Sequence, residues 1–312
     1  MKVLIFTHKS DIDGMGGAIL SKLAFENVDY VLCETFSLQN EIAKYFKNQK
    51  IYEYDMIFLT DLWLEEPTLT KVALDEKLKN KFFVFDHHKS ALEENFNKYD
   101  FTTIKISDEK GRCSGTSLFY EYLISNKYLK NKKAIEDFVE LTRRYDTWEW
   151  KNIYNDEKAH ELTLLFDILG RNGYITTIFE KLKNIDQHEN FEFSDSEKMI
   201  INNKKEQVEE KIKNYINKIY YKEVLGYRAG IIFIDYEYRN DIAEYIRENK
   251  IDIDFVMLIA LDYGTISYRK IKEGMNVRKI AEKFSGKGHD GAASSPISSE
   301  SIGNILNILT NI

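Results

Sequence analysis

The chain has 312 residues, of which 43% are hydrophobic and 30% are charged, a composition typical of a globular protein. Its formal charge of −7 comes from the first 194 residues, which hold 33 Asp and Glu against 26 Lys and Arg. This balance argues against a duplex-binding protein, which carries a basic surface, and no apolar run approaches the roughly 20 residues of a membrane-spanning helix.

The first residues, MKVLIFTHKSD, predict a strand followed by an acidic turn. They lack the apolar core and the small-residue cleavage site of a signal peptide. Cys33 and Cys113 match no metal-ligand spacing, so we expect free thiols in a reducing compartment. Both features predict a cytoplasmic protein.

Strand-like runs alternate with amphipathic helical runs through the first part of the chain. In order, these runs are KVLIFT, GAILSKLAFEN, DYVLCET, LQNEIAKYFKN, DMIFLTDL, PTLTKVALDEKLK and KFFVFDHH. The βαβα alternation predicts an α/β fold with a mainly parallel sheet and helices on both faces. In such a fold, ligands bind at the carboxyl ends of the strands.

The pattern becomes helical over about 115–182, and residues 194–224 predict one long charged helix. A second set of α/β runs follows it: GYRAGIIFI, NDIAEYIREN, DFVMLIAL, GTISYRK and NVRKIAEKF. We therefore predict a catalytic domain over 1–194, a helical connector over 195–224 and a smaller α/β domain over 225–312.

Histidine and aspartate side chains follow three of the predicted strands and one predicted helix. They are His8, Asp11 and Asp13; Asp61; Asp86, His87 and His88; and Asp146. Taken singly, each also fits a structural role such as a helix cap or a surface ion pair. Together, several carboxylates at one sheet edge repel one another unless a cation neutralises them. Histidine and carboxylate ligands without thiolates favour Mn²⁺ over a structural zinc of the cysteine kind.

Four of these motifs, in this order, resemble those of the DHH phosphoesterase superfamily. They are SDIDGMGG, the strand-end Asp61, the DHH at 86–88 and the later Asp146. Within the superfamily, FTHKSDIDGMGGAILSKLAF and YDTWEW are most similar to the NrnB-type branch of oligoribonucleases or cyclic-nucleotide phosphodiesterases.

The resemblance extends into the C-terminal part of the chain. There, SYR at 267–269 and GKGHDGAAS at 286–294 resemble the substrate-binding segments of a DHHA1-type domain. Lys287 and Ser294 replace two glycines of that domain's GGGHxxAAG motif, which leaves the choice of substrate open.

The resemblance implies two metal ions, with Mn²⁺ as the first choice and Mg²⁺ or Co²⁺ as alternatives. Asp61 is the implied bridging ligand, and a water between two such ions becomes a hydroxide nucleophile near neutral pH. His88 is implied to face the phosphate, and Asp86 to orient a histidine. The implied ligands are His8, Asp11 and Asp61 for one ion, and Asp13, Asp61, His87 and Asp146 for the other.

In the C-terminal domain, the resemblance implies that Arg269 and His289 bind a phosphate or a terminal group of the substrate. Gly286 and Gly288 would expose backbone N–H groups to the same ligand. The structural alternative is a strand arginine in a surface ion pair beside a glycine-rich turn.

Two further segments have both a structural and a functional interpretation. Ser114 and Thr116 predict a helix cap, and the helix N-terminus could also bind an anion. Trp148 and Trp150 are predicted in the core, with base stacking as the alternative.

The sequence therefore predicts a metal-dependent phosphohydrolase that cleaves short oligoribonucleotides to 5′-mononucleotides. The alternatives are a cyclic mono- or dinucleotide phosphodiesterase, a 3′-phosphoadenosine 5′-phosphate phosphatase, and a nucleotide-sensing module without turnover. A processive exonuclease on long DNA is disfavoured by the acidic charge. We expect short oligonucleotides or small nucleotides as partners, with no long duplex and no membrane, and a homodimer stays open.

Overall fold

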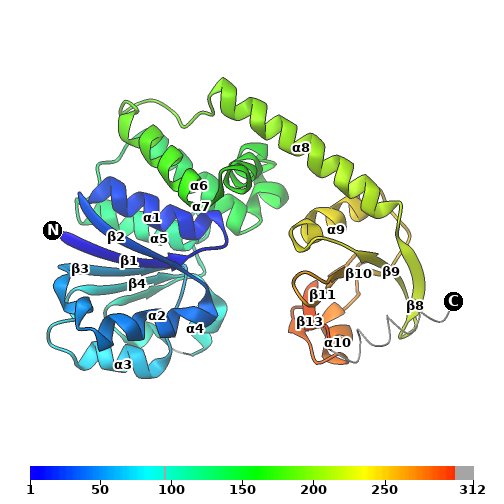
Figure 1. Cartoon of the computed structure of the whole chain (residues 1–312), viewed down its shortest axis with the longest axis horizontal. Coiled ribbons are helices and arrows are strands. Elements are labelled where there is room, and N and C mark those ends of the chain that lie inside the picture. Colours follow the sequence, from blue (N-terminus) through cyan, green and yellow to red (C-terminus); the bar gives the residue numbers. More distant parts are fainter. Residues whose placement is uncertain (95, 299–312) are drawn as a thin grey trace. The chain divides into compact units, whose positions relative to one another are not determined.

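The computed structural model describes residues 1–94 and 96–298, without the side chains of Phe96 and Lys287. The chain divides into two units, Met1–Asn202 and Asn203–Ile312, and each is described by itself (Figure 1). The division falls within the long helix α8 (Asp195–Ile216). In the described part of the chain, no helix combines the length and the apolar character needed to cross a membrane.

The first unit contains a five-stranded sheet with the order β2-β1-β3-β4-β5, and all of its strands are parallel. Every residue of β3 is buried, as are five of the seven residues of β1. Such continuous apolar runs are typical of parallel strands that are covered on both faces. The strands are β1 (Lys2–His8), β2 (Asn27–Cys33), β3 (Met56–Thr60), β4 (Phe82–Asp86) and β5 (Thr102–Ile104).

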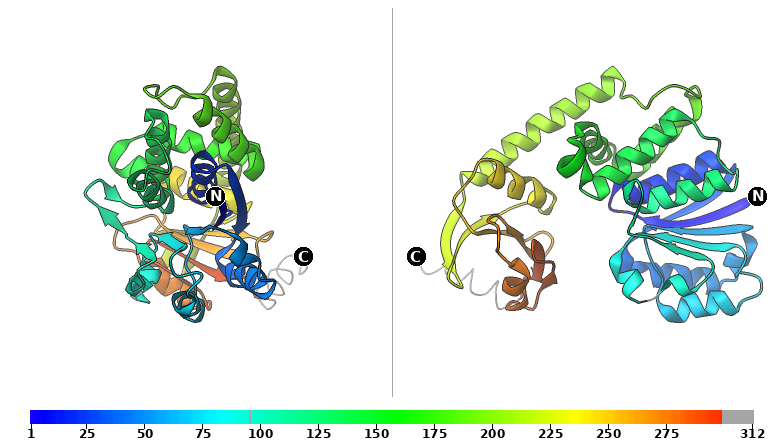
Figure 2. Two further views of the ribbon diagram at one scale, coloured as in Figure 1. Left: turned by 90° about the vertical axis from the view of Figure 1, so that its left-hand side faces the viewer. Right: turned by 180° about the vertical axis from the view of Figure 1, so that it is seen from behind.

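Helices cover both faces of this sheet, and each face has its own hydrophobic core (Figures 1 and 2). One layer contains α1, α5, α6 and α7, and the other contains α2, α3 and α4. This arrangement confirms the predicted α/β fold. The helices are α1 (Ile12–Ala24), α2 (Thr35–Lys47), α3 (Glu66–Leu74), α4 (Lys89–Glu93), α5 (Gly115–Ser125), α6 (Lys133–Asp146) and α7 (Glu157–Asn184).

Short elements connect the larger ones in this unit. A two-stranded ribbon precedes α5, a π-helical segment lies between α6 and α7, and two 3₁₀ turns follow α2 and α4. They are β6 (Ser107–Asp108), β7 (Gly111–Arg112), η3 (Trp150–Tyr154), η1 (Lys50–Glu53) and η2 (Phe96–Lys98).

The glycines after β1 allow α1 to lie very close to its neighbours. Asp11 caps α1 by accepting a hydrogen bond of 2.9 Å from Gly14 N. A Cβ atom on Gly14 would lie 1.9 Å from His8 O, and one on Gly16 would lie 2.2 Å from Thr116 Oγ1. Larger residues at these positions would therefore push α1 away from the end of β1 and from the start of α5.

The second unit contains a mixed six-stranded sheet with the order β12-β13-β11-β10-β9-β8. Strands β9 and β10 are parallel, and the other neighbours are antiparallel. One hydrophobic core joins the sheet to α9, and another joins it to α10. The elements are β8 (Tyr220–Val224), β9 (Tyr227–Phe233), η4 (Tyr236–Tyr238), α9 (Arg239–Glu248), β10 (Phe255–Ala260), β11 (Thr265–Lys270), α10 (Val277–Glu282), β12 (Lys287–Gly288) and β13 (Ala292–Pro296).

The helix predicted over 194–224 is shorter in the structure. It ends at Ile216, and Tyr220–Val224 forms the edge strand β8. Ile219 N donates a hydrogen bond to Ile216 O, so the chain turns immediately after the helix. The charged and aromatic residues of β8 fit an exposed edge strand, because among the described residues only β9 pairs with it.

Candidate metal centre and active site

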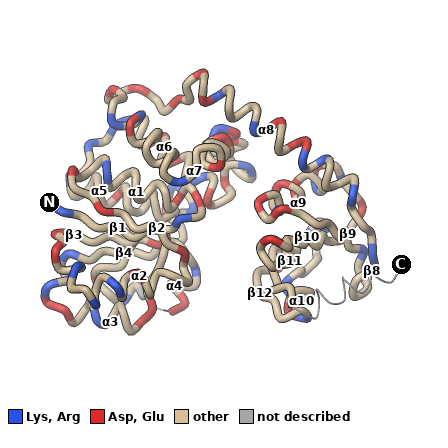
Figure 3. The backbone as a smooth tube through the Cα atoms, in the orientation of Figure 1, with Lys and Arg blue, Asp and Glu red and all other residues tan. Residues whose placement is uncertain are grey.

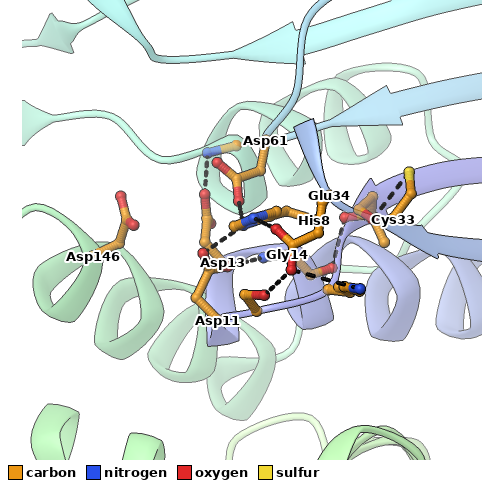
Figure 4. Close-up of polar contacts among 12 residues, drawn as sticks. His8, Asp11, Asp13, Gly14, Cys33, Glu34, Asp61 and Asp146 are labelled. Carbon is orange, nitrogen blue, oxygen red and sulfur yellow. Dashed lines mark hydrogen bonds and ion pairs between the residues drawn. The ribbon is translucent and has the colours of Figure 1, made fainter. Parts of the chain in front are cut away.

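The carboxyl ends of β1, β3 and β4 meet at one edge of the first unit's sheet and carry the predicted ligands. His8 is the last residue of β1, Asp61 follows β3, and Asp86 is the last residue of β4. Asp146 comes from a different direction, as the last residue of α6, and its Oδ2 lies 3.4 Å from His87 Nε2. The parallel topology thus brings together side chains that are far apart in the sequence (Figure 4).

Three groups of side chains at this edge have the composition and the spacing to hold a metal ion. Within each group, the potential ligand atoms lie within 4.8 Å of one another. Asp61 and His87 each belong to two groups, so the three groups form one continuous centre. The groups are His8, Asp11 and Asp61; Asp13, His87 and Asp146; and Asp61, His87 and His88.

Asp61 lies at the middle of this centre and is only 3% exposed. Its Oδ1 is 3.3 Å from His87 Nε2, and its Oδ2 is 3.5 Å from His8 Nδ1. Burial raises the pKa of Asp61, but the neighbouring imidazoles of His8, His87 and His88 outweigh burial and hold that pKa well below its ordinary value. Asp61 is therefore a buried anion. Its φ of 57° places it in the left-handed region, which aspartate tolerates better than most residues.

Asp13 is held by the start of α5. Its Oδ2 accepts a hydrogen bond of 2.7 Å from Gly115 N, and its Oδ1 accepts one of 2.9 Å from Thr116 N. Ser114 caps this helix, as predicted, by accepting from Ser117 N. The helix N-terminus therefore binds a carboxylate of the protein itself, and these two amides are not open to a substrate phosphate. Burial and the charge of Asp61 raise the pKa of Asp13 to about 6.

Two histidines supply positive charge to the centre. Burial lowers the pKa of His8, but Asp11 and Asp61 outweigh it and raise that pKa to about 11. His87 shows the same balance, with Asp61, Asp146 and Asp13 raising its pKa to about 10. In the metal-free protein, the two imidazoles balance the negative charge of the carboxylates, and both are therefore protonated near neutral pH.

Buried oxygens without donors test whether these residues fit a metal ion. Asp61 Oδ2, Asp86 Oδ2 and Asp146 Oδ2 are buried and accept no hydrogen bond within the described residues. Leaving an ionised oxygen buried without a partner is costly, and a bound cation removes that cost. The donor set of imidazole nitrogens and carboxylate oxygens suits divalent ions such as Mn²⁺. The residues present therefore fit a divalent metal centre.

Glu34 is a member of the site that the sequence analysis missed. It directly follows β2, and its Oε2 lies 3.2 Å from His8 Nε2. Its Oε1 accepts a hydrogen bond of 2.6 Å from Ser10 Oγ. Because His8 pairs with Cys33 in the β1–β2 register, Glu34 lies at the same sheet edge as the predicted ligands. A carboxylate directly after a fourth parallel strand was the signal that could have identified it.

His88 and Asp86 form a pair beside the centre. His88 Nδ1 donates a hydrogen bond of 2.8 Å to Asp86 Oδ1, which leaves Nε2 as the second polar atom of the ring. The ring packs 5.3 Å from that of Trp63, and the side chain is 43% exposed. Burial lowers the pKa of His88, whereas Asp86 and Asp61 raise it, with a net increase.

The two tryptophans of YDTWEW differ in environment. Trp150 is buried in the core, as predicted, and its ring stacks 5.1 Å from that of His160. Trp148 is 40% exposed and has a φ of 62°, so its prediction as a core residue is wrong. Its backbone turns out of α6 two residues after Asp146, which exposes the ring.

In the second unit, Arg269 lies on β11 and is half-buried. Its Nε and Nη2 donate to Asn240 Oδ1, and its Nη1 donates to Tyr268 O. His289 is exposed in the turn between β12 and β13. Both predicted substrate-binding side chains therefore belong to the same sheet.

The predicted phosphate-binding glycines are explained by packing. Gly286 N donates a hydrogen bond of 2.8 Å to Ala281 O, so this N–H is already used. Gly288 has a φ of 147°, and a Cβ atom there would lie 2.4 Å from Ala293 Cα. Close approach to β13 therefore requires glycine at position 288.

Comparison with known proteins finds a family match in the first part of the chain and a relative that aligns with most of it. Residues 2–142 match the profile described as DHH family, N-terminal domain. The chain is 28% identical over 299 residues to oligoribonuclease NrnB of Bacillus subtilis (strain 168), covering 95% of this chain and 73% of that protein.

Two solved structures are similar in fold. One is the pGpG-specific phosphodiesterase PggH of Vibrio cholerae, with a TM-score of 0.56, 15% identity and coverage of 99% of this chain and 97% of that chain. The other is exonuclease RecJ bound to manganese, with a TM-score of 0.54, 14% identity and coverage of 98% and 88%. The two structures share the fold of this chain over nearly its whole length, and the match to the N-terminal domain of the DHH family covers residues 2–142.

Proposed function

We propose that this chain is a metal-dependent phosphodiesterase that degrades short oligoribonucleotides to 5′-mononucleotides. The observation that carries the proposal is the continuous centre around Asp61, in which three groups of ligands share side chains. The similarity to an oligoribonuclease over most of both chains, and to a phosphodiesterase that is specific for pGpG, supports a short phosphodiester substrate.

The ligands fall into two sets that share Asp61. A bound pair of divalent ions would neutralise phosphate charge and supply a water of lowered pKa as the nucleophile. Manganese is favoured by the donor set and by its presence in the RecJ structure. The proposed ligands are His8, Asp11 and Asp61 for one ion, and Asp13, His87 and Asp146 for the other, with Asp61 shared through its 3.3 Å contact with His87.

The surrounding residues would hold this arrangement in place. The amides of Gly115 and Thr116 fix both oxygens of Asp13, and Glu34 fixes the ring of His8. His88 would contact the substrate phosphate through Nε2, because Asp86 occupies its Nδ1. A group that is already oriented loses little entropy on binding, which favours catalysis.

The second unit would contribute substrate binding. The β11–β13 segment that contains Arg269, Gly288 and His289 remains the proposed substrate-binding region, with Gly286 in a packing role. The domain division at 194 and 224 and the cytoplasmic location are part of the same proposal. Both cysteines are buried free thiols, which agrees with a reducing compartment.

The test is a substrate panel. The purified chain is incubated with Mn²⁺, or with EDTA, and with RNA dinucleotides, longer RNA, cyclic dinucleotides, cyclic mononucleotides and 3′-phosphoadenosine 5′-phosphate. Release of 5′-mononucleotides from short RNA, lost in EDTA, supports the proposal. The exposed surface variant Glu109→Gln is the matched control for purification and folding.

Each alternative gives a different result in this panel. Hydrolysis restricted to cyclic substrates identifies a cyclic-nucleotide phosphodiesterase. Hydrolysis restricted to 3′-phosphoadenosine 5′-phosphate, with release of inorganic phosphate, identifies a phosphatase. Tight nucleotide binding without product under every metal condition identifies a sensing module. Any of these three results contradicts the oligoribonuclease proposal.

A further inference from the structure

Most hydrogen-bond donors of Arg269 are used by acceptors inside the second unit. Its Nε and Nη2 donate to Asn240 Oδ1 at 3.2 and 3.1 Å, and its Nη1 donates to the carbonyls of Tyr268 and Ala293 at 3.1 and 3.5 Å. A guanidinium has five N–H groups, and four are used in this way. Within the described residues, no carboxylate pairs with Arg269, so its charge is uncompensated.

Arg239, the first residue of α9, has more donors available. Its guanidinium lies 3.9 Å from the centre of the Tyr236 ring, and one Nη1 donates to Tyr236 O. Tyr236 also stacks on Tyr263, with ring centres 4.0 Å apart and planes 6° apart. At these distances, Tyr263 and the guanidinium occupy opposite faces of Tyr236. The stack therefore fixes Arg239, while in the described part of the chain its Nε and Nη2 donate to no acceptor.

Asn240, the next residue of α9, carries a second set of donors. Its Oδ1 accepts both bonds from Arg269, which turns its Nδ2 away from that residue. In the described ranges, the two N–H groups of Nδ2 donate to no acceptor, and α9 begins without a side-chain cap. Arg239 and Asn240 thus present unpaired donors at the same helix start.

Charges of both signs surround this helix start, which carries Asp241 in its first turn and follows Glu237. Burial, together with the charges of Arg239 and Arg247, lowers the pKa of Arg269 to about 10, so it stays protonated. Arg247 is paired with Glu244, and the nearby Asp235 is paired with Lys211. Within the described residues, neither Arg239 nor Arg269 forms an ion pair with a carboxylate. Planar guanidinium donors in such surroundings are well suited to a phosphate.

We propose that Arg239 and the side-chain amide of Asn240 bind a phosphate group of the nucleotide substrate, and that Arg269 is a positioning residue that holds Asn240. The charge of two guanidiniums matches a dianionic terminal phosphate better than the single charge of an internal diester. Arg239 and Asn240 are both partly exposed, and the outer ring of the stack, Tyr263, is 61% exposed. The choice of a nucleotide as ligand rests on the proposed function.

The test measures binding instead of hydrolysis. The full chain is kept in EDTA, and equilibrium binding of ApA is compared with that of pApA and ApAp. We expect the wild type to bind at least one phosphorylated form more tightly than ApA. Arg239→Gln should reduce that affinity roughly tenfold or more, because a charge-assisted hydrogen bond is lost. Arg239→Lys should retain part of it.

Two further variants sharpen the result. Asn240→Asp removes the Nδ2 donors and pairs a new carboxylate with Arg269, so it should also weaken binding of the phosphorylated form. Arg228→Gln is the matched control, because Arg228 is exposed on the same unit and pairs with Asp252. Its binding should equal that of the wild type.

The outcomes separate this inference from the proposed function. A folded Arg239→Gln variant that binds pApA and ApAp as tightly as the wild type overturns the inference, and so does a wild type without preference for a terminal phosphate. If the chain binds pApA or ApAp more tightly than ApA, and Arg239 is required for this preference, the inference is supported. If the same chain hydrolyses no substrate with Mn²⁺, the proposed function is contradicted while the inference stands.

Discussion

A Cβ atom on Gly115 would lie 2.6 Å from the backbone nitrogen of Asp61. Gly115 begins α5, and Asp61 follows β3 with a φ of 57°. The central carboxylate of the site is therefore held against the start of a helix by direct backbone contact. The same glycine donates its N–H to Asp13, so one residue positions ligands from both proposed metal sites.

Gly115→Ala is expected to disturb the centre without removing any ligand. The added methyl group must displace Asp61 or α5, and shifts of this kind cost roughly 1–3 kcal/mol. We expect Mn²⁺ affinity to fall at least tenfold, measured by calorimetry. Gly173→Ala is the control, because its Cβ would meet a single side-chain atom at 3.3 Å. Equal affinities in the two variants would contradict the positioning role of Gly115.

Two substitutions of Asp61 should separate its charge from its backbone conformation. Asp61→Asn keeps a residue that tolerates the left-handed region and removes the anion, so bound metal and hydrolysis should fall by orders of magnitude. Asp61→Ala should in addition destabilise the fold by roughly 1 kcal/mol through backbone strain. Full activity in Asp61→Asn would rule out a central role for this carboxylate.

Glu34→Gln should weaken metal binding through His8. The Glu34 carboxylate lies 3.2 Å from His8 Nε2, and partners of this kind orient a ligating ring. We expect a loss of about tenfold to 100-fold in Mn²⁺ affinity, with activity recovered at high Mn²⁺. Glu41→Gln, in the following helix, is the matched control. A purely structural role for Glu34 would lower thermal stability and leave the metal dependence unchanged.

Metal binding should release protons and strengthen as pH rises. The pKa of His8 is raised to about 11 and that of His87 to about 10, and only the neutral ring can ligate a metal. These raised pKa values stabilise the metal-free fold below pH 6.5, and that contribution is lost as pH rises from 6.5 towards 10 or 11. The increase in melting temperature on adding Mn²⁺ should therefore grow between about pH 6.5 and 8.5.

Calorimetry in two buffers of different ionisation enthalpy counts the protons released. A binding enthalpy that is the same in both buffers would show that the rings were already neutral. His188 is the histidine for comparison, because it lies outside the metal groups. The variant His188→Gln should give the same proton count as the wild type.

Substrate length is predicted from charge. Lys and Arg residues are interspersed with Asp and Glu along both units (Figure 3), and the first 194 residues are acidic overall. Added nucleotides should gain few phosphate contacts, so we expect kcat/KM to be highest at roughly two to five nucleotides, with a shallow salt dependence. An efficiency that climbs steadily to about 20 nucleotides and collapses in moderate salt would indicate a long-strand exonuclease.

The sequence predicted the sheet edge because alternating strands and helices leave few topologies open. Once β1, β3 and β4 are parallel neighbours, His8, Asp61 and Asp86 must share an edge. The link between Asp13 and Gly115 could not be predicted in this way, because it joins residues 102 positions apart through backbone amides that any sequence carries. No periodic pattern of apolar residues in the sequence indicates such a contact.

The end of α8 shows a different limit. The charged pattern continues from Ile216 into Tyr220–Val224 without a glycine or proline to mark a boundary. Pairing with β9 decides that these five residues form a strand, so tertiary context overrides the local pattern. Trp148 was misplaced for a related reason, since only the turn after α6 exposes its ring.

The hydrogen bonds from the start of α5 to Asp13 also affect the order of folding during protein synthesis. On the ribosome, Asp13 emerges about a hundred residues before the amides that fix it, so no early segment of the nascent chain has a finished binding site. The first unit must fold around its own charged histidines, with His8 and His87 as temporary partners of the carboxylates. Binding of the proposed metal ions would then follow the folding of this unit and would release protons from side chains that are already in place.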